Sequence, residues 1–374
     1  MKTVLSVFGT RPEAIKMAPV LQALSREAGV RSLVCVTAQH REMLDQVLTL
    51  FGIRPDHDLD LMRDGQTLTE ITTRTLALLA PYLDEARPDL LLVQGDTTTT
   101  MAASLAAFYR RIPVAHVEAG LRTGDNSYPY PEEVNRRITT VIAAHHFAPT
   151  KIAAANLARE GIAEAAITVT GNTVIDALLS VVRTTPQSLP ELPFRGGRIV
   201  LVTAHRRENF GAPMQEIFAA LRDLAAAHPD VDMVYPVHPN PNVSGPARKA
   251  LADIPGVHVI PPLEYKAFAD LMAASYLILT DSGGIQEEAP SLGKPVLVLR
   301  DETERPEAVE AGVVRLVGPH RAAIVQAATE LLTHPKAYAA MATRINPYGD
   351  GKAAGRIVAK VRELLGRDQA EAAT

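Results

Sequence analysis

Three acidic residues occupy positions that a parallel sheet would bring to one edge. Asp96 comes shortly after the apolar run 90–94, Glu118 follows the run 114–117, and Glu132 opens a segment with helical spacing. Each has a structural explanation, because aspartate is a common N-cap and acids in a first helical turn complement the helix dipole. Three carboxylates on one rim nonetheless indicate acid/base chemistry.

Cationic and imidazole side chains follow other strand-like runs. Arg11 and Lys16 lie near the start of the first expected helix, where a cation opposes the helix dipole and an anionic ligand would explain it. His205, beside Arg206, and His238 each follow an apolar run in the second half of the chain. Two such histidines, one of them next to arginines, indicate an anionic ligand or an acid/base role.

A glycine-rich turn follows a further apolar run. The stretch 280–290 reads Thr-Asp-Ser-Gly-Gly-Ile-Gln-Glu-Glu-Ala-Pro and predicts a strand end, a tight turn and a helix start. Gly283 and Gly284 would let a ligand approach the backbone, and the free N–H groups of a first helical turn favour an anion such as phosphate. The alternative is a turn in which Asp281 or Ser282 only caps the helix.

Short apolar runs alternate with longer segments of helical period along the whole chain. The expected strands are 3–8, 32–37, 90–94, 114–117, 199–203, 233–237, 257–260, 276–280 and 296–299. This alternation predicts an α/β protein whose parallel sheets are covered by helices. The proline- and glycine-rich stretch 183–197 divides the chain into two halves, and a last helix is expected at 353–365 with a frayed tail after Gly366.

Composition limits the classes of function. The chain has 374 residues, enough for two domains, and its net charge of −4 gives no support for nucleic-acid binding. Its single cysteine, Cys35, suits a reducing cytoplasm, and no apolar stretch is long enough to span a membrane or to act as a signal peptide. Dinucleotide, P-loop and metal-ligand spacings are missing from the sequence, so no cofactor and no metal are expected.

An ordered set of motifs carries a resemblance to a known family. The motifs are FGTRPE at 8–13, GDTT at 95–98, HVEAGLR at 116–122, GNT at 171–173, HRREN at 205–209, DSGGIQEE at 281–288 and ERPE at 304–307. Together they resemble the non-hydrolysing UDP-N-acetylglucosamine 2-epimerases over nearly the whole chain. The resemblance implies the glycosyltransferase-B architecture, with two Rossmann-like domains facing a cleft. The first domain would span 1–170, joined by the C-terminal helix at about 353–374, and the second, UDP-binding domain would span 171–352.

The resemblance also implies a reaction, a site and partners. UDP-N-acetylglucosamine (UDP-GlcNAc) would be epimerised reversibly at C2 to UDP-N-acetylmannosamine (UDP-ManNAc), by elimination of UDP to 2-acetamidoglucal and re-addition, for surface polysaccharide precursors. A homodimer and a second, activating UDP-GlcNAc would follow by the same resemblance. The residues it implies are Asp96, Glu118, Glu132 and His205 for catalysis; Arg11, Lys16, Arg136, Phe268, Ser282, Gly283, Gly284 and Glu288 for substrate binding; and Gln39, Arg206 and His238 for the activating molecule.

Four other functions stay open at this point. The hydrolysing relatives release free N-acetylmannosamine and UDP, and a different modified UDP-amino-sugar is a further alternative. Glycosyl transfer shares the fold and the phosphate turn, but it does not call for three carboxylates. A regulator that only binds a sugar nucleotide would not need Asp96, Glu118 and Glu132 together.

Overall fold

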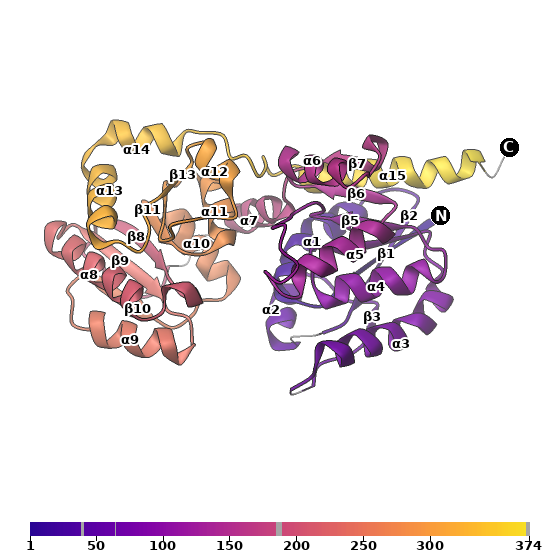
Figure 1. Ribbon diagram of the computed structural model, residues 1–374, viewed down its shortest axis with the longest axis horizontal. Coiled ribbons are helices and arrows are strands. Elements are labelled where there is room, and N and C mark those ends of the chain that lie inside the picture. The colour runs from indigo at the N-terminus through magenta and orange to yellow at the C-terminus, as the bar shows by residue number, and fades with distance from the viewer. Residues whose placement is uncertain (39–40, 64, 185–188, 372–374) are drawn as a thin grey trace. The chain divides into compact units, whose positions relative to one another are not determined.

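The protein divides into two compact units. The computed structural model describes residues 1–38, 41–63, 65–184 and 189–371. The first unit comprises Met1–Ala177 and Tyr348–Thr374, and the second comprises Leu178–Pro347 (Figure 1). The sequence predicted the first boundary at 170 and the return of the chain at about 353. Each unit is built around its own parallel sheet, and the two are described in turn.

The sheet of the first unit has the order β3-β2-β1-β4-β5-β6-β7, and all of its strand pairs are parallel. Its central strands are apolar on both faces because helices cover both sides, and their side chains are almost wholly buried. The strands are β1 Lys2–Phe8, β2 Val30–Val36, β3 His57–Asp58, β4 Leu90–Gln94, β5 Val114–Val117, β6 His145–Ala148 and β7 Ile167–Val169.

The helices of the first unit connect these strands, and α7 runs across the boundary between the units. They are α1 Arg11–Leu24, α2 Arg41–Phe51, α3 Leu68–Ala86, α4 Thr98–Phe108, α5 Glu132–Ile142, α6 Lys151–Arg159, α7 Thr173–Thr184 and α15 Ala353–Glu371, with the 3-10 turn η1 Glu164–Ala166. The last helix, α15 (yellow in Figure 1), packs against α1 through an apolar stripe that includes Ile357, Val361 and Leu365.

The predicted fraying after Gly366 is wrong, because α15 continues to Glu371. A single glycine costs a helix only about 1 kcal/mol relative to alanine. The residues that follow Gly366 are Arg, Asp, Gln, Ala and Glu, and most of these are good helix formers.

The second unit repeats the same plan with the sheet order β10-β9-β8-β11-β12-β13, again parallel throughout. Its strands are β8 Arg198–Thr203, β9 Val231–Pro236, β10 Val257–Ile260, β11 Leu277–Thr280, β12 Val296–Val298 and β13 Val314–Leu316. Its helices are α8 Ala212–Ala227, α9 Pro241–Leu251, α10 Tyr265–Ala274, α11 Gly283–Glu288, α12 Pro306–Glu310, α13 Arg321–Thr333 and α14 Pro335–Ala342, with 3-10 turns η2 Arg207–Asn209 and η3 Ala289–Leu292. One apolar core joins β8, β9, β11 and β12 to α8, α9 and α13.

The direction of strand succession reverses once in each sheet. In the first unit the reversal lies between β1 and β4, and in the second it lies between β8 and β11. Ligands of open α/β sheets bind outside the carboxyl ends of the strands at this point. The loops after these four strands, and after their neighbours, are therefore where binding residues are expected.

All nine strands expected from the sequence are present, with ends that differ by at most two residues. Four more strands, β3, β6, β7 and β13, were not predicted. Three of them have only two or three residues, too few to show a pattern, and β6 reads His-His-Phe-Ala. Within the described ranges, no helix is long and apolar enough to cross a membrane.

Two buried histidines stand opposite each other on β5 and β6, His116 and His146. Burial, the largest cause, lowers the pKa of His146 to about 4, and the positive charge of Arg122 lowers it further. The unfolded chain protonates a histidine near pH 6.5, so between pH 6.5 and about 4 the unfolded state binds more protons than the folded state. Stability therefore falls as the pH falls through this window.

We expect His146→Leu to reduce this pH dependence. The slope of the unfolding free energy between pH 4.5 and 6.5 should decrease by up to about 1.4 kcal/mol per pH unit. Urea unfolding of the two proteins at several pH values measures it. Phe147→Leu, on the same strand, is the control, because it should lower stability by a similar amount at each pH. A wild-type slope in the His146 variant would place the proton uptake elsewhere.

Candidate active site

Asp96 lies at the carboxyl end of β4, where α5 contacts it. Arg136 donates from Nε and Nη2 to Asp96 Oδ2 at 3.0 and 2.6 Å, and Asn135 Nδ2 donates to the Asp96 backbone carbonyl at 2.9 Å. Both arginine bonds end on the same oxygen, so they hold Oδ2 in place without engaging Oδ1. The side chain is 27% exposed, and it can therefore meet a ligand.

Glu118 follows β5, the neighbouring strand, and its backbone is left-handed with φ of 65°. Lys16 Nζ donates to its Oε1 at 2.7 Å, and Gln94 Nε2 donates to its Oε2 at 3.0 Å. A left-handed conformation costs a residue with a side chain on the order of 1 kcal/mol, and it persists where the surroundings determine it. Strain of this kind gathers at functional sites.

The first turn of α5 carries Glu132 and Glu133, which have different surroundings. Glu133 is fully buried and accepts hydrogen bonds from the backbone N–H groups of Thr123 and Gly124 and from Arg136. Burial opposes its ionisation, but these bonds outweigh burial and hold the pKa of Glu133 below its usual range. Glu133 therefore supports the loop, whereas the half-buried Glu132 begins the helix that holds Asp96.

The predicted substrate-binding cations of this unit lie among the carboxylates. Lys16, on α1, is bonded to Glu118, and Arg136, on α5, is bonded to Asp96. Arg11 is the half-buried first residue of α1. The structure thus brings residues from three separate stretches of the chain to one edge of the sheet.

Glu13 is a further buried acid of this edge, and its spacing from Thr10 in the sequence is that of a helix capping box at the start of α1. Its carboxylate accepts from the backbone N–H groups of Gly9 and Thr10 at 3.1 and 2.8 Å, and from the hydroxyls of Thr97 and Thr100 at 2.8 and 3.1 Å. Burial, the largest cause, raises the pKa of Glu13 against these bonds. Glu13 joins the loop after β1 to the loop after β4, a contact that spacing in the sequence does not show.

Asp281 plays the corresponding part in the second unit. It is fully buried after β11, and its Oδ2 accepts from the backbone N–H groups of His205 and Arg206, both at 2.8 Å, and from Asn209 Nδ2 at 3.0 Å. These partners lie in the loop after β8, so Asp281 joins two loops. Asp281 does not cap the following helix, because the N-cap residue of α11 is Ser282.

The glycines after Ser282 do not need to be glycine for the fold. A Cβ added to Gly283 would lie 3.5 Å from Arg206 Nη2 and 3.8 Å from Arg305 Nη2, which are ordinary contacts. One added to Gly284 would lie 3.6 Å from Glu288 Oε1. Neither glycine has a left-handed backbone. The fold thus does not require either glycine, and the close approach of a ligand to this turn stays a prediction.

Two guanidinium groups reach this turn from different loops. Arg206 comes from the loop after β8 and Arg305 from the segment before α12, where Arg305 is also paired with Glu287. Arg305 was not predicted as a binding residue, although the motif at 304–307 contains it. The two arginines place cationic hydrogen-bond donors next to Gly283, and such donors suit an anion.

His205 and His238 lie side by side at the ends of β8 and β9. Their rings stack with centroids 5.5 Å apart, and His238 is exposed. Burial lowers the pKa of His205; the negative charge of Asp281 opposes this shift, and His238 and Arg206 add to it.

Three more predicted binding residues remain to be placed. Phe268 is half-buried on α10, and Glu288 is the half-buried last residue of α11, beside Gly284. Gln39 lies outside the described residues.

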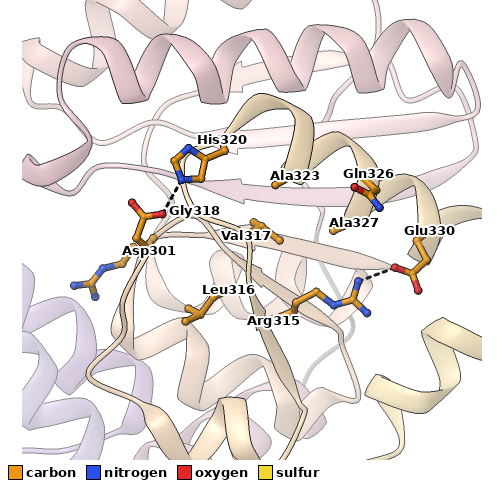
Figure 2. Close-up of a pocket in the computed structure, with 11 residues that line it drawn as sticks. Asp301, Arg315, Leu316, Val317, Gly318, His320, Ala323, Gln326, Ala327 and Glu330 are labelled. Atoms are coloured by element: carbon orange, nitrogen blue, oxygen red, sulfur yellow. Dashed lines mark hydrogen bonds and ion pairs between the residues drawn. The ribbon is translucent and has the colours of Figure 1, made fainter.

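A hollow of about 390 Å³ in the second unit lies between the edge strand β13 and α13 (Figure 2). Four of its polar side chains are paired with one another: His320 with Asp301, and Arg315 with Glu330, both at 2.7 Å. The hollow lies two strands away from β11 and its lining does not include the phosphate turn. We therefore do not assign the nucleotide to it. Among the described residues, no group of three or more His, Cys, Asp or Glu side chains could hold a metal ion.

A family model described as UDP-N-acetylglucosamine 2-epimerase matches residues 22–362 of the chain. The chain belongs to the UDP-N-acetylglucosamine 2-epimerase family. The epimerase of Escherichia coli K12 is 57% identical over 364 residues, which cover 95% of this chain and 97% of that protein. The epimerase of Yersinia pestis is 58% identical over the same length, with the same coverage.

Solved structures of the epimerase family agree with this assignment. The Neisseria meningitidis UDP-GlcNAc 2-epimerase, bound to UDP-GlcNAc, has a TM-score of 0.85 at 50% identity and covers 96% of this chain and 100% of its own. A Listeria monocytogenes structure described as a putative epimerase has a TM-score of 0.92 at 47% identity, with 98% of both chains covered. The predicted family, the isomerase class and the α/β fold with two Rossmann-like domains are confirmed.

The fold itself is shared more widely than the epimerase family. A structure described as the glycotransferase of kitacinnamycin has a TM-score of 0.66 at 14% identity and covers 96% of this chain. At that identity only the architecture is shared. The reaction of an epimerase must therefore be argued from the side chains at the strand ends and not from the fold.

Proposed function

We propose that this chain interconverts UDP-GlcNAc and UDP-ManNAc by reversible epimerisation at C2, without net hydrolysis. The observation that carries the proposal is the edge of the first sheet, where Asp96 and Glu118 follow neighbouring strands and α5, which begins at Glu132, bonds to Asp96. A protein that only binds a sugar nucleotide would not need this set. Family membership supplies the substrate, because relatives of this chain carry the name of that epimerase.

The chemistry explains why such residues would be needed. The hydrogen on C2 is not next to a carbonyl, so its direct removal as a proton would be very costly. If a carboxylate takes this proton while the bond from C1 to the UDP oxygen breaks, the C–H electron pair forms a C1–C2 double bond and UDP leaves with the C–O pair. The product, 2-acetamidoglucal, is planar at C2. Protonation of its other face and re-addition of UDP give the manno epimer, with no redox change.

The two units would divide this work. In the first, Asp96, Glu118 and Glu132 would carry protons, with Arg11, Lys16 and Arg136 placing the sugar and its phosphates. In the second, the turn at Ser282, Gly283 and Gly284 would hold the diphosphate with Arg305, and the preorganised donors would stabilise the charge that develops on departing UDP. His205 would act near the diphosphate, Glu288 would accept from the ribose hydroxyls, and Phe268 would lie against uracil.

The remaining parts of the proposal concern the oligomeric state, an activating ligand, the pathway and the cell compartment. A homodimer is supported by an apolar surface at the ends of α4 and α5, where Phe108, Tyr109 and Val141 are 57%, 67% and 85% exposed. A second, activating UDP-GlcNAc, with Arg206 and His238 among its contacts, belongs to the proposal, as does a supply of surface polysaccharide precursors. The buried, unpaired Cys35 suits a cytoplasmic enzyme.

Proton NMR in deuterated water tests the reaction. The purified protein is mixed with UDP-GlcNAc, and the C2 position and free UDP are followed. Deuterium at C2 together with UDP-ManNAc, with UDP still attached at equilibrium, supports elimination and re-addition. Accumulating N-acetylmannosamine and UDP would identify a hydrolysing enzyme. An unchanged C2 position would overturn the proposal and leave glycosyl transfer or simple binding.

A further inference from the structure

The two carboxylate oxygens of Asp281 have very different surroundings. Oδ2 accepts three hydrogen bonds, from the backbone of His205 and Arg206 and from the side chain of Asn209. Oδ1 is also buried, yet no hydrogen-bond donor reaches it within the described part of the chain. The imidazole Nδ1 of His205 stands 3.7 Å from it. That is about half an ångström beyond the N–H···O range.

We propose that Asp281 is a positioning residue for His205, accepting a hydrogen bond from its Nδ1–H so that Nε2 is the nitrogen presented to the ligand. A buried carboxylate oxygen without a donor is unfavourable, and a small tilt of the ring supplies one. The role of this pair in turnover rests on the proposed function. The existence of the Asp281–His205 hydrogen bond does not rest on that function, because the bond joins two side chains of the free protein.

Hydrogen bonds around His205 restrict the position of its backbone and of its ring. The same carboxylate that faces the ring also binds the backbone N–H of His205, so main chain and side chain are fixed by one group. The preceding carbonyl, that of Ala204, accepts from the hydroxyl of the buried Tyr235. One residue earlier, the Thr203 hydroxyl bonds the Thr280 hydroxyl at 2.6 Å across β8 and β11. Because the backbone before the ring is fixed by these bonds, the imidazole can keep one orientation toward a ligand.

The charges around the ring give Asp281 a second effect. His238 and Arg206 both disfavour a positive charge on His205, whereas Asp281 favours one. The neighbouring His238 accepts a hydrogen bond at its own Nδ1 from the Asn240 N–H at 3.1 Å. Its ring is therefore turned by its own loop and does not compete for Asp281. Without the carboxylate, His205 would be left with His238 and Arg206, which both disfavour a positive charge on its ring.

Asp281→Asn tests the pair with little change in shape. The amide oxygen can still accept from the backbone of His205 and Arg206, but the amide NH₂ would then face Nδ1 and donate to it. Nδ1 would become an acceptor, and the proton would move to Nε2. The tautomer is thus reversed by a change of one side-chain atom.

The tautomer can be measured directly in the complete protein. Long-range proton–nitrogen NMR on ¹⁵N-histidine-labelled protein without ligand, with His205 assigned by its loss in His205→Gln, distinguishes the two forms. We expect the Nδ1–H form in the wild type and the Nε2–H form in Asp281→Asn. An Nε2–H tautomer in the wild type would overturn the proposal, even if the variant failed to fold.

Kinetics then separate positioning from general support of the fold. Asp281→Asn should lower kcat roughly tenfold with little change in KM, since one charge-assisted bond is lost. In the His205→Gln background the same substitution should cause no further loss, because Asp281 acts through the ring. An undiminished loss in that background would show a purely structural role. A wild-type Nδ1–H tautomer in a protein without epimerase activity would refute the proposed function and leave the pair intact.

Discussion

Asp96→Asn and Glu118→Gln are each expected to lower kcat for epimerisation about 10³-fold. General acid–base catalysis contributes typically 10²–10⁴-fold, and an amide cannot carry the proton. The amide oxygen of the Asp96 variant can still accept from Arg136, and that of the Glu118 variant from Lys16, so the edge of the sheet should keep its shape. Turnover of UDP-GlcNAc and deuterium incorporation at C2 are measured together for each variant.

A matched ion pair in the same unit provides the control. Asp84 is bonded to Arg110 at 2.7 Å, much as Asp96 is to Arg136, but its side chain is 64% exposed on α3. Asp84→Asn should keep wild-type turnover. Wild-type turnover in the Asp96 and Glu118 variants would remove them from the mechanism. A variant that still exchanges the C2 hydrogen of UDP-GlcNAc with solvent, yet forms no UDP-ManNAc, would identify the residue that serves the opposite face.

Gly283→Ala is expected to weaken UDP binding about a hundredfold, equivalent to about 2.7 kcal/mol, without destabilising the protein. The added methyl group meets Arg206 and Arg305 only at ordinary contact distances, so the free protein can accept it. A diphosphate seated on the backbone of this turn would be pushed away from the N–H groups that bind it. Isothermal titration calorimetry with UDP and thermal unfolding of the free protein test the two halves of this prediction.

Gly120→Ala is the control, and we expect it to destabilise the protein because Gly120 is required by the fold. Gly120 has φ of 89°, and a Cβ there would lie 2.2 Å from the backbone carbonyl oxygen of Ala153. This variant should lose on the order of 2 kcal/mol of stability or more. If Gly283→Ala binds UDP like the wild type, or is destabilised as strongly as Gly120→Ala, the turn does not serve as a phosphate site.

The central strands could be predicted from sequence because their surroundings are uniform. A strand such as β4, with helices on both faces, shows an uninterrupted apolar run. The four strands that were missed, β3, β6, β7 and β13, lie at or next to a sheet edge and show no such run, and His146 on β6 is buried despite its polarity. The strand ends therefore indicated where a site would be, and the ordered motifs indicated the family.

The bonds within the site could not be predicted in the same way. Lys16 and Glu118 are 102 residues apart in sequence, and Glu13 and Thr100 are 87 apart, so neither contact follows from a local pattern. The spacing of Thr10 and Glu13 indicates only a helix cap. The hydrogen bonds of Glu13 to the loop after β4 depend on β1 and β4 being neighbours in the sheet, which the sequence does not show. Arg305 was missed for a similar reason, since it lies near Gly283 in space although the two belong to different loops.

The burial of Glu13 and Asp281 has a practical consequence for chemical labelling. A water-soluble carbodiimide modifies carboxylates that solvent can reach, and these two acids are 2% and 0% exposed. Asp96, with a side chain 27% exposed, is accessible in the same protein. Protection of Asp96 by UDP-GlcNAc in such an experiment would thus report on occupancy of the sheet edge. The two acids that join the loops would stay unmodified and would serve as internal references in the mass spectrum.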